Sequence, residues 1–309
     1  MPNGRFAPSP TGDLHLGNLR TALVAWLFAR STGSRFAVRM EDLDRVASSR
    51  EQAARQLQDL ASLGLDWDGP VLYQSERFPL YEAAIDRLTA AGLTYPCFCT
   101  RREIRDAVSA PQGTMSPDGA YPGTCRDLSA EQRADRERAG RPAALRLRSA
   151  HEVVAVGDRL HGVYRSRVDD VVLRRNDGVP AYNLAVVVDD ASTGVEEVVR
   201  ADDLLPVSPS QAYVGDLLGF DRVTYAHVPL VLGPDGDRLA KRHGSVTLTD
   251  LAADGITPAD VLSRLAGSLG LARPGEAVST SSLVDRFDPD VLPMTAWRAA
   301  PWPGTPWPE

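Results

Sequence analysis

The chain has 309 residues, of which 43% are hydrophobic and 24% charged, a composition typical of a globular protein with one large or two modest domains. Its formal net charge of −7 argues against a protein that coats nucleic acid non-specifically, so any nucleic-acid contact is expected to be local. The odd number of cysteines, three, favours a reducing, cytoplasmic location over a disulfide framework. No apolar run approaches the ~18–20 residues of a membrane span. Nothing in the sequence points to an oligomer, and a monomer is the default expectation.

Strands and helices are predicted to alternate over the first ninety or so residues. The apolar patterns predict short strands at 5–7 and 36–40 and helices at 16–30, 49–63 and 79–91. This alternation is typical of an α/β fold with a doubly wound, Rossmann-type parallel sheet. We therefore predict that residues 1–95 form the first half of a catalytic domain of this class.

The alternation breaks at residues 96–165, which we predict to be an insertion. It contains all three cysteines, a loop rich in Pro, Gly and Ser, and an arginine-rich helical stretch at 126–148 with seven Arg against four Asp plus Glu. The arginine-rich stretch fits a solvated helical face with paired charges at least as well as a binding patch.

Residues 166–245 are predicted to be the second half of the catalytic domain. Ser208 and Pro209 predict the start of a helix that runs through Leu218. Residues 246–298 have a helical pattern, and residues 299–309, rich in Pro and Trp, are predicted to be a disordered tail. Buried-strand composition predicts strands at 168–173, 184–188, 195–199 and 228–232.

A histidine, His15, lies where the first predicted helix begins, after a turn that contains Pro8 and Gly12. In a doubly wound sheet, ligands bind outside the carboxyl ends of the strands, where a helix N-terminus offers N–H groups and a positive dipole to a phosphate. His15 would add a donor there, and Gly17 would let a base or ribose approach the backbone. The alternative is a histidine that only caps the helix.

Lys241 is the one lysine among the 34 Lys plus Arg residues. Its compact ammonium can reach a phosphate as a point charge, which the planar guanidinium cannot copy. Glycines at 233, 236 and 244 flank it and suggest a loop that can move. A lone lysine could also be an accident of an arginine-favouring composition.

Together these segments resemble the signatures of class I aminoacyl-tRNA synthetases. The segment from His15 to Asn18 is similar to their HIGH motif, and the segment 238–242 is similar to their KMSKS loop. Blocks at 5–12, 40–44, 181–190 and 199–204 resemble the glutamate-specific branch of that family.

The short chain with its Cys-x-Cys insertion resembles the glutamyl-queuosine tRNA(Asp) synthetases, which attach glutamate to the queuosine base in the anticodon. A glutamyl-tRNA synthetase would continue into an anticodon-binding domain. The chain departs from the class signatures at Asn18, in the single lysine of the loop, and at Ala201, where a glycine is usual; the roles of Arg242 and His243 are left open.

The resemblance implies an ATP-dependent ligase that activates L-glutamate as glutamyl-adenylate, with Mg²⁺ accompanying ATP. It implies that His15 and Lys241 stabilise the charge that gathers on the phosphates in the transition state. The implied ATP-binding residues are Pro8, Gly12, His15, Gly17, Asn18, Leu239, Lys241 and Arg242.

A glutamate pocket needs about two cations and one anion, since each unpaired buried charge is costly. By resemblance, Arg5 and Arg200 face the two carboxylates and Glu41 takes the ammonium, all at the ends of predicted strands. The full set of implied glutamate-binding residues is Arg5, Ala7, Ser9, Glu41, Tyr182 and Arg200.

Cys97, Cys99 and Cys125 are the candidate ligands of one structural Zn²⁺. Three thiolates and one further ligand would complete a tetrahedral site, and the family pattern implies Tyr121 as the fourth. The alternative is three reduced thiols in a small core.

Three further functions stay open at this point. The first is a nucleotidylyltransferase, against which the two-arginine, one-glutamate set and the cysteines argue. The second is a catalytically idle regulator that binds glutamate or tRNA, against which His15 and Lys241 argue. The third is a glutamyl-tRNA synthetase with discriminating specificity. The expected partners are ATP, L-glutamate and a queuosine-bearing tRNA(Asp), contacted through residues 126–148 and 246–298, with no membrane.

Overall fold

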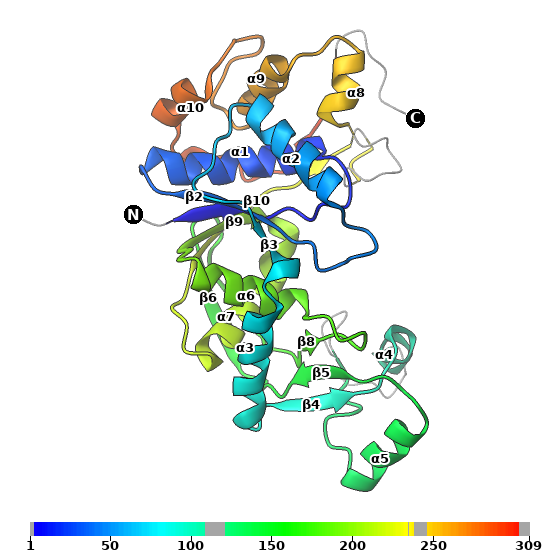
Figure 1. The fold of residues 1–309 in the computed structure, drawn as a ribbon. Coiled ribbons are helices and arrows are strands. Elements are labelled where there is room, and N and C mark those ends of the chain that lie inside the picture. Colours follow the sequence, from blue (N-terminus) through cyan, green and yellow to red (C-terminus); the bar gives the residue numbers. More distant parts are fainter. Residues whose placement is uncertain (1–2, 109–120, 234, 238–245, 303–309) are drawn as a thin grey trace.

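The computed structural model describes residues 3–108, 121–233, 235–237 and 246–302 (Figure 1). Its central sheet consists of two parallel ladders, β3-β2-β1 and β9-β10-β6, with β7 added antiparallel to β6. The ladders meet where the backbone N–H of Glu197 donates to the carbonyl of Asn3 at 3.1 Å. The predicted doubly wound parallel sheet is therefore confirmed. Its strands are β1 (Gly4–Phe6), β2 (Phe36–Met40), β3 (Leu72–Tyr73), β6 (Val153–Asp158), β7 (Gly162–Arg167), β9 (Glu197–Ala201) and β10 (Thr224–Val228).

Helices cover both faces of this sheet (Figure 1). One face is covered by α1 (Leu16–Ser31), α2 (Arg50–Ser62), α8 (Leu248–Ala253), α9 (Pro258–Ser268) and α10 (Thr280–Arg286). The other face is covered by α3 (Phe78–Ala90), α6 (Tyr182–Ser192) and α7 (Ser208–Leu217). Short 3-10 helices lie at Gln74–Glu76, Asp202–Val207 and Pro289–Val291. None of the described helices is long and apolar enough to cross a membrane.

The first helix, α1, is buried on almost all sides between the sheet and the C-terminal helices. Leu19, Leu23 and Leu27 have no exposed surface, and burying each such side chain stabilises the fold by roughly 1.5–3 kcal/mol. A helix that is apolar all round is expected in such a position. Arg20 lies in the same core, where it donates to Ser268 Oγ at 3.0 Å and to the carbonyl of Pro229 at 2.9 Å. The α1 helix therefore holds the two halves of the chain together.

A smaller unit projects from the sheet (Figure 1). It contains an antiparallel sheet in the order β4-β5-β8 and a separate cluster of buried residues that includes Tyr95, Phe98 and Tyr121. We call this unit the cysteine module. Its elements are β4 (Thr94–Cys97), α4 (Arg101–Val108), α5 (Ala130–Arg138), β5 (Ala144–Leu147) and β8 (Val172–Arg174).

One predicted strand is wrong. Residues 184–188 lie inside the α6 helix, which packs against α3 and α7. A short apolar run that is buried on all sides has no visible period, and its composition alone cannot distinguish a strand from a helix. As a result Tyr182 is the first residue of a helix and does not follow a strand.

Other predicted elements are shifted or shortened. The strand expected at 168–173 is β8, at Val172–Arg174, and the run 228–232 is divided between the end of β10 and β11 (Val231–Leu232). The helix expected within 126–148 is only α5, because the last part of that stretch forms β5. The hairpin of β6 and β7, within the predicted insertion, pairs with the central sheet through β10.

The predicted disordered tail begins in packed structure. The last strand, β12 (Trp297–Arg298), pairs with β11, and Ala299 is fully buried. The guanidinium of Arg264 lies 3.9 Å from the ring centre of Trp302. Residues 303–309 lie outside the described part of the chain.

Candidate active site

A cavity of about 750 Å³ opens at the carboxyl ends of β1, β2 and β9. It lies at the point where the strand order reverses between β1 and β9, which is where doubly wound sheets bind their ligands. The structure brings many of the predicted site residues together around it. Those that line it are Arg5, Ala7, Pro8, Ser9, Gly12, His15, Asn18, Glu41, Tyr182 and Arg200.

Of the remaining residues implied for ATP binding, Gly17 is described and is not among the residues that line this cavity. Leu239, Lys241 and Arg242 lie outside the described residues. A Cβ at Gly17 would lie 2.9 Å from His15 Cε1 and 3.0 Å from Nδ1. The glycine therefore makes room for the histidine ring.

His15 caps the N-terminus of α1. Its Nδ1 accepts hydrogen bonds from the backbone N–H groups of Gly17 at 3.1 Å and Asn18 at 3.4 Å, and the Asn18 side chain accepts from the His15 backbone N–H. Because His15 also lines the cavity, capping and ligand binding are compatible. The cap fixes the ring at the positive end of the α1 helix dipole.

Buried arginine and carboxylate side chains form a network beside the cavity. Arg5 donates through Nε and Nη2 to the two carboxylate oxygens of Asp190, at 3.3 and 3.4 Å. Arg39 donates through Nη1 to Asp190 at 2.6 Å and through Nη2 to Glu41 at 3.3 Å, and its Nε lies 3.6 Å from Asp189. All five side chains are largely buried. Paired in this way, the charges hold Arg5 and Glu41 in place before any ligand arrives.

The pKa directions reflect this network. Burial alone would raise the pKa of Asp190, but Arg39 and Arg5 outweigh it and hold the pKa below its usual value. For Glu41, burial wins over the same two arginines, and the pKa is raised. Burial disfavours the charged form of Arg39, yet its carboxylate neighbours raise its pKa overall. Glu41 is thus the carboxylate that has most to gain from a further cation.

Arg200 enters the cavity from β9, and each of its three nitrogens has a partner. Nη1 donates to Gln211 at 2.8 Å and to Tyr182 Oη at 3.5 Å, and Nη2 donates to Ser208 Oγ at 2.8 Å. Nε donates to Nε2 of His227 at 3.0 Å. Of these contacts, the one with Tyr182 is the longest, which makes it the one that an incoming carboxylate can most readily replace.

A second cavity, of about 660 Å³, adjoins the first. The two share Ser9, Glu41 and Tyr182 as lining residues. The second cavity extends to the cysteine module, where Arg101 and Arg175 line it. Two reactants could therefore meet at Tyr182 and Glu41, one from each side.

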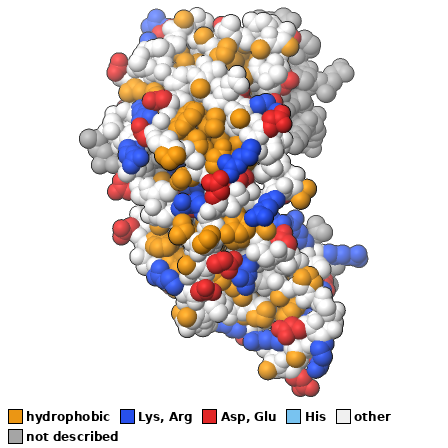
Figure 2. Space-filling model, in the orientation of Figure 1, with side chains coloured by type: hydrophobic (Ala, Val, Ile, Leu, Met, Phe, Trp, Pro, Cys, Tyr) orange, Lys and Arg blue, Asp and Glu red, His pale blue; other side chains and the backbone are white. Residues whose placement is uncertain are grey.

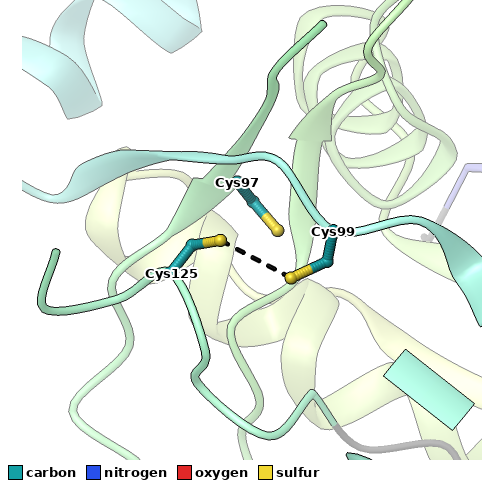
Figure 3. A group of neighbouring side chains, drawn as sticks. All are labelled: Cys97, Cys99 and Cys125. Atoms are coloured by element: carbon teal, nitrogen blue, oxygen red, sulfur yellow. Dashed lines mark hydrogen bonds between the residues drawn. The ribbon is translucent and has the colours of Figure 1, made fainter. Parts of the chain in front are cut away.

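The three cysteine thiols of the module converge (Figure 3). Their sulfur atoms all lie within 4.8 Å of one another, and Cys99 Sγ is 3.5 Å from Cys125 Sγ. Tyr121 Oη lies 3.3 Å from Cys97 Sγ and 3.6 Å from Cys99 Sγ. Hydrogen bonding with Cys99 and Tyr121 outweighs burial and lowers the pKa of Cys97, which favours the thiolate that metals bind. The group can hold a metal ion.

Comparison with known proteins identifies the family. The family model described as tRNA synthetases class I (E and Q), catalytic domain, matches residues 3–284. The chain belongs to this family of class I tRNA synthetases. It is therefore a ligase of the aminoacyl-tRNA synthetase type.

This chain covers a larger share of some members of the family than of others. The chain is 61% identical over 295 residues to a glutamyl-Q tRNA(Asp) synthetase from Nocardia farcinica, covering 95% of this chain and 92% of that protein. It is 40% identical over 299 residues to a glutamate–tRNA ligase from Geobacter sulfurreducens, covering 94% of this chain and 62% of that protein. Its fold is similar, with a TM-score of 0.80 and 25% identity, to the crystal structure of a glutamate tRNA ligase from Elizabethkingia meningosepticum in complex with its amino acid, covering 96% of this chain and 66% of that one.

Several residues that organise this synthetase site had no role in the sequence prediction. The hydrogen bond between Arg39 and Asp190 links β2 to α6 beside the pocket. His227 and Asp158 lie behind Arg200. The sequence contained one signal for each pair. For Arg39 and Asp190 it is a charged residue beside apolar positions, and for Asp158 and His227 it is a histidine within the apolar run of β10. Neither signal says which residues meet, because the partners are far apart along the chain.

Proposed function

We propose that this chain activates L-glutamate with ATP as glutamyl-adenylate and transfers the glutamate to the queuosine base in the anticodon of tRNA(Asp). The observation that carries the proposal is the single cavity in which Arg5, Arg200 and Glu41 lie beside the helix cap His15. Two cations and one anion match the two carboxylates and one ammonium of glutamate. The 61% identity to a protein named glutamyl-Q tRNA(Asp) synthetase supports the acceptor.

In this proposal Arg5 and Arg200 bind the carboxylates, and Glu41 binds the ammonium. Arg39 donates to Glu41 at 3.3 Å, so the carboxylate is already oriented when the substrate arrives. Ser9 and Tyr182 would donate hydrogen bonds to the glutamate, and Ala7 would complete the wall of the pocket. Because an arginine can grip a carboxylate with two parallel hydrogen bonds, the site would favour glutamate over glutamine.

Activation would join a glutamate carboxylate oxygen to the α-phosphorus of ATP and release pyrophosphate. Negative charge gathers on the phosphate oxygens in the transition state, so donors aimed at them lower the barrier. We assign this role to His15 near the α-phosphate and to Lys241 at the β- and γ-phosphates. Pro8, Gly12, Gly17, Asn18, Leu239 and Arg242 would complete the ATP site. When bound with ATP, Mg²⁺ would neutralise part of the phosphate charge.

Transfer would follow when a nucleophilic group of the acceptor attacks the glutamyl carbonyl carbon and AMP leaves. The adjoining cavity supports a route for the acceptor, since it reaches Tyr182 and Glu41 from the side of the cysteine module. Figure 2 shows Arg side chains projecting from the part of the molecule that carries α4 and α5. These basic groups suit a local contact with the phosphates of a tRNA loop.

We also propose that Cys97, Cys99, Cys125 and Tyr121 hold one structural Zn²⁺. The convergence of the three sulfur atoms and the tyrosine oxygen supports this. Elemental analysis should find about one zinc per chain, and a fully folded, metal-free protein with three titratable thiols would contradict the site. We further propose that the enzyme works as a cytoplasmic monomer.

Glutamyl-tRNA synthetase activity is the second candidate. The 40% identity to a glutamate–tRNA ligase and the fold shared with another favour it. The two functions differ in the acceptor, and discriminating glutamyl-tRNA synthetases are expected to need their tRNA for the activation step.

The test is glutamate-dependent exchange between ATP and labelled pyrophosphate without tRNA, followed by transfer of labelled glutamate. We expect exchange with glutamate alone and labelling of queuosine-bearing tRNA(Asp), but not of tRNA(Asp) that lacks queuosine. Exchange that requires tRNA(Glu) would instead favour the second candidate. Absence of exchange under both conditions would contradict both and favour a binding-only protein, while nucleotidyl transfer to another substrate would favour a nucleotidylyltransferase.

A further inference from the structure

Behind the glutamate pocket lies a buried pair, Asp158 and His227, that has no contact with the cavity itself. Neither side chain has any exposed surface. Asp158 ends β6 and His227 lies in β10, and the two strands are neighbours in the sheet. Asp158 Oδ2 lies 2.5 Å from His227 Nδ1 and 3.1 Å from its backbone nitrogen.

The hydrogen bonds define which nitrogen of His227 carries the proton. A guanidinium can only donate, so His227 Nε2, 3.0 Å from Arg200 Nε, must be the acceptor. Nδ1 therefore carries the hydrogen and donates it to Asp158. The other oxygen of Asp158 accepts from the backbone N–H groups of Leu160 and His161, each at 2.9 Å, so the carboxylate cannot turn.

The surroundings favour this neutral form of the ring. Burial first, and then the nearby positive charge of Arg200, lower the pKa of His227 below its usual value, although Asp158 acts in the opposite direction. A doubly protonated ring would place an N–H against the guanidinium. The neutral ring instead offers Arg200 a lone pair deep in the sheet, where an unsatisfied Nε–H would be costly.

We propose that Asp158 and His227 position Arg200 for glutamate: the aspartate selects the tautomer of the histidine, and the histidine fixes the plane of the guanidinium. This inference rests on the proposed role of Arg200 in glutamate binding. The chain of bonds leaves the Nη1 side of Arg200, with its long contact to Tyr182, directed to the substrate. Asp158 and His227 are positioning residues, since neither of them lines the cavity.

Two variants of His227 separate positioning from general stability. In His227→Gln the amide oxygen can reach the place of Nε2 and accept from Arg200. In His227→Asn the shorter amide can reach only the place of Nδ1 and contact Asp158. His227→Gln loses the ring contact with Asp158, and His227→Asn loses the contacts of Nε2 with Arg200 and with Ser208 Oγ, which lies 3.2 Å from it. Both variants should lower the melting temperature, but only His227→Asn loses the bond to Arg200.

The experiment measures KM for glutamate, KM for ATP and kcat in pyrophosphate exchange. We expect His227→Asn to raise KM for glutamate on the order of 10- to 100-fold, as for the loss of a charge-assisted hydrogen bond, with KM for ATP nearly unchanged. His227→Gln should recover most of this loss. Asp158→Asn should raise KM for glutamate in the same direction and serves as the test if His227→Asn does not fold.

Equal KM values for the Asn and Gln variants, or a drop in melting temperature with an unchanged KM for glutamate, would overturn the positioning role. Wild-type protein that shows no exchange would instead count against the proposed function. In that case glutamate binding to the same variants, measured by calorimetry, still tests the positioning role. Wild-type protein that binds no glutamate would overturn both the positioning role and the proposed function.

Discussion

The end of the cavity that contains Arg5 and Glu41 and the cysteine module are each organised around a buried aspartate that pairs with arginine. In the cavity, Asp190 binds Arg5 and Arg39, which lie 185 and 151 positions away in the chain. In the module, Asp170 accepts from Tyr95 Oη at 2.6 Å and from Arg126 at 2.5 Å, and these residues lie 75 and 44 positions away.

The difference lies in what the arginines do next. Arg5 reaches from Asp190 into the cavity, and Arg39 reaches to Glu41, so this network preorganises a binding site. Arg126 reaches from Asp170 to the carbonyl of Ser149 at 2.7 Å, so this network joins the loop that carries Arg126 to the segments between β5 and β6 and between β7 and β8. A buried aspartate–arginine pair can thus organise a binding site or hold two segments of the chain together. Which of these it does depends on where the other N–H groups of the arginine point.

The largest effect is expected for Asp190→Asn. Removing this charge leaves two buried arginines undercompensated, which should destabilise the fold by about 3 kcal/mol. Displacement of Arg5 and Glu41 should also lower glutamate-dependent exchange by more than about 100-fold. Chemical denaturation and the exchange assay measure the two effects, and a variant that keeps full exchange would contradict a preorganising role for Asp190.

Removal of the metal by a strong chelator should act mainly on the module. The small cluster around Tyr95, Phe98 and Tyr121 offers little apolar burial of its own, so we expect loss of one zinc and a lower melting temperature. Transfer to tRNA should fall further than exchange, which should change by less than about tenfold because the glutamate pocket shares no partners with the metal. Cys125→Ser should reproduce this result, and an equal loss of both activities would contradict the separation.

Asp170→Asn is the matched counterpart of Asp190→Asn. Loss of its charge-assisted hydrogen bonds should cost about 2 kcal/mol of stability and leave exchange nearly unchanged. Burial would raise the pKa of Asp170, but Arg126, Tyr95 and Ser149 hold it below 3.8. The stabilisation is therefore present above pH 4 and is lost as the pH falls through the lowered pKa, so unfolding of the wild type and the variant should converge at acid pH. Reduced exchange at neutral pH would show that the two networks are coupled.

The smallest effect is expected for Asp59→Asn in α2. Burial, reinforced by Asp13, raises the pKa of Asp59 from 3.8 to about 6. Its neighbour Arg55 is bonded to Asp13 and Glu51. Because ionisation of Asp59 opposes folding above pH 6, the variant should be more stable by about 1–2 kcal/mol at pH 8 and equal to the wild type below pH 4. Asp285→Asn, at an exposed position of α10, is the control substitution.

The sequence by itself determined the class of sheet, the starts of its first helices and ten of the residues that line the cavity. The helices predicted to begin at 16 and 49 begin at Leu16 and Arg50, with His15 and Ser49 as their caps, because capping depends on residues next to one another in the chain. The predicted lining residues meet because the carboxyl ends of β1, β2 and β9 lie along one edge of the parallel sheet. These are consequences of local order and of a regular architecture.

Only the tertiary structure decided what lies behind that edge. The apolar run 184–188 became helical because it packs between α3 and α7, where burial on all sides erases any period. Sequence spacing does not specify the hydrogen-bond partners of Arg39, Asp190, Asp158 and His227. Their proposed roles depend on these partners. A buried charge must find its counter-charge in space, and which of many acids or arginines it meets depends on how the sheet and helices pack.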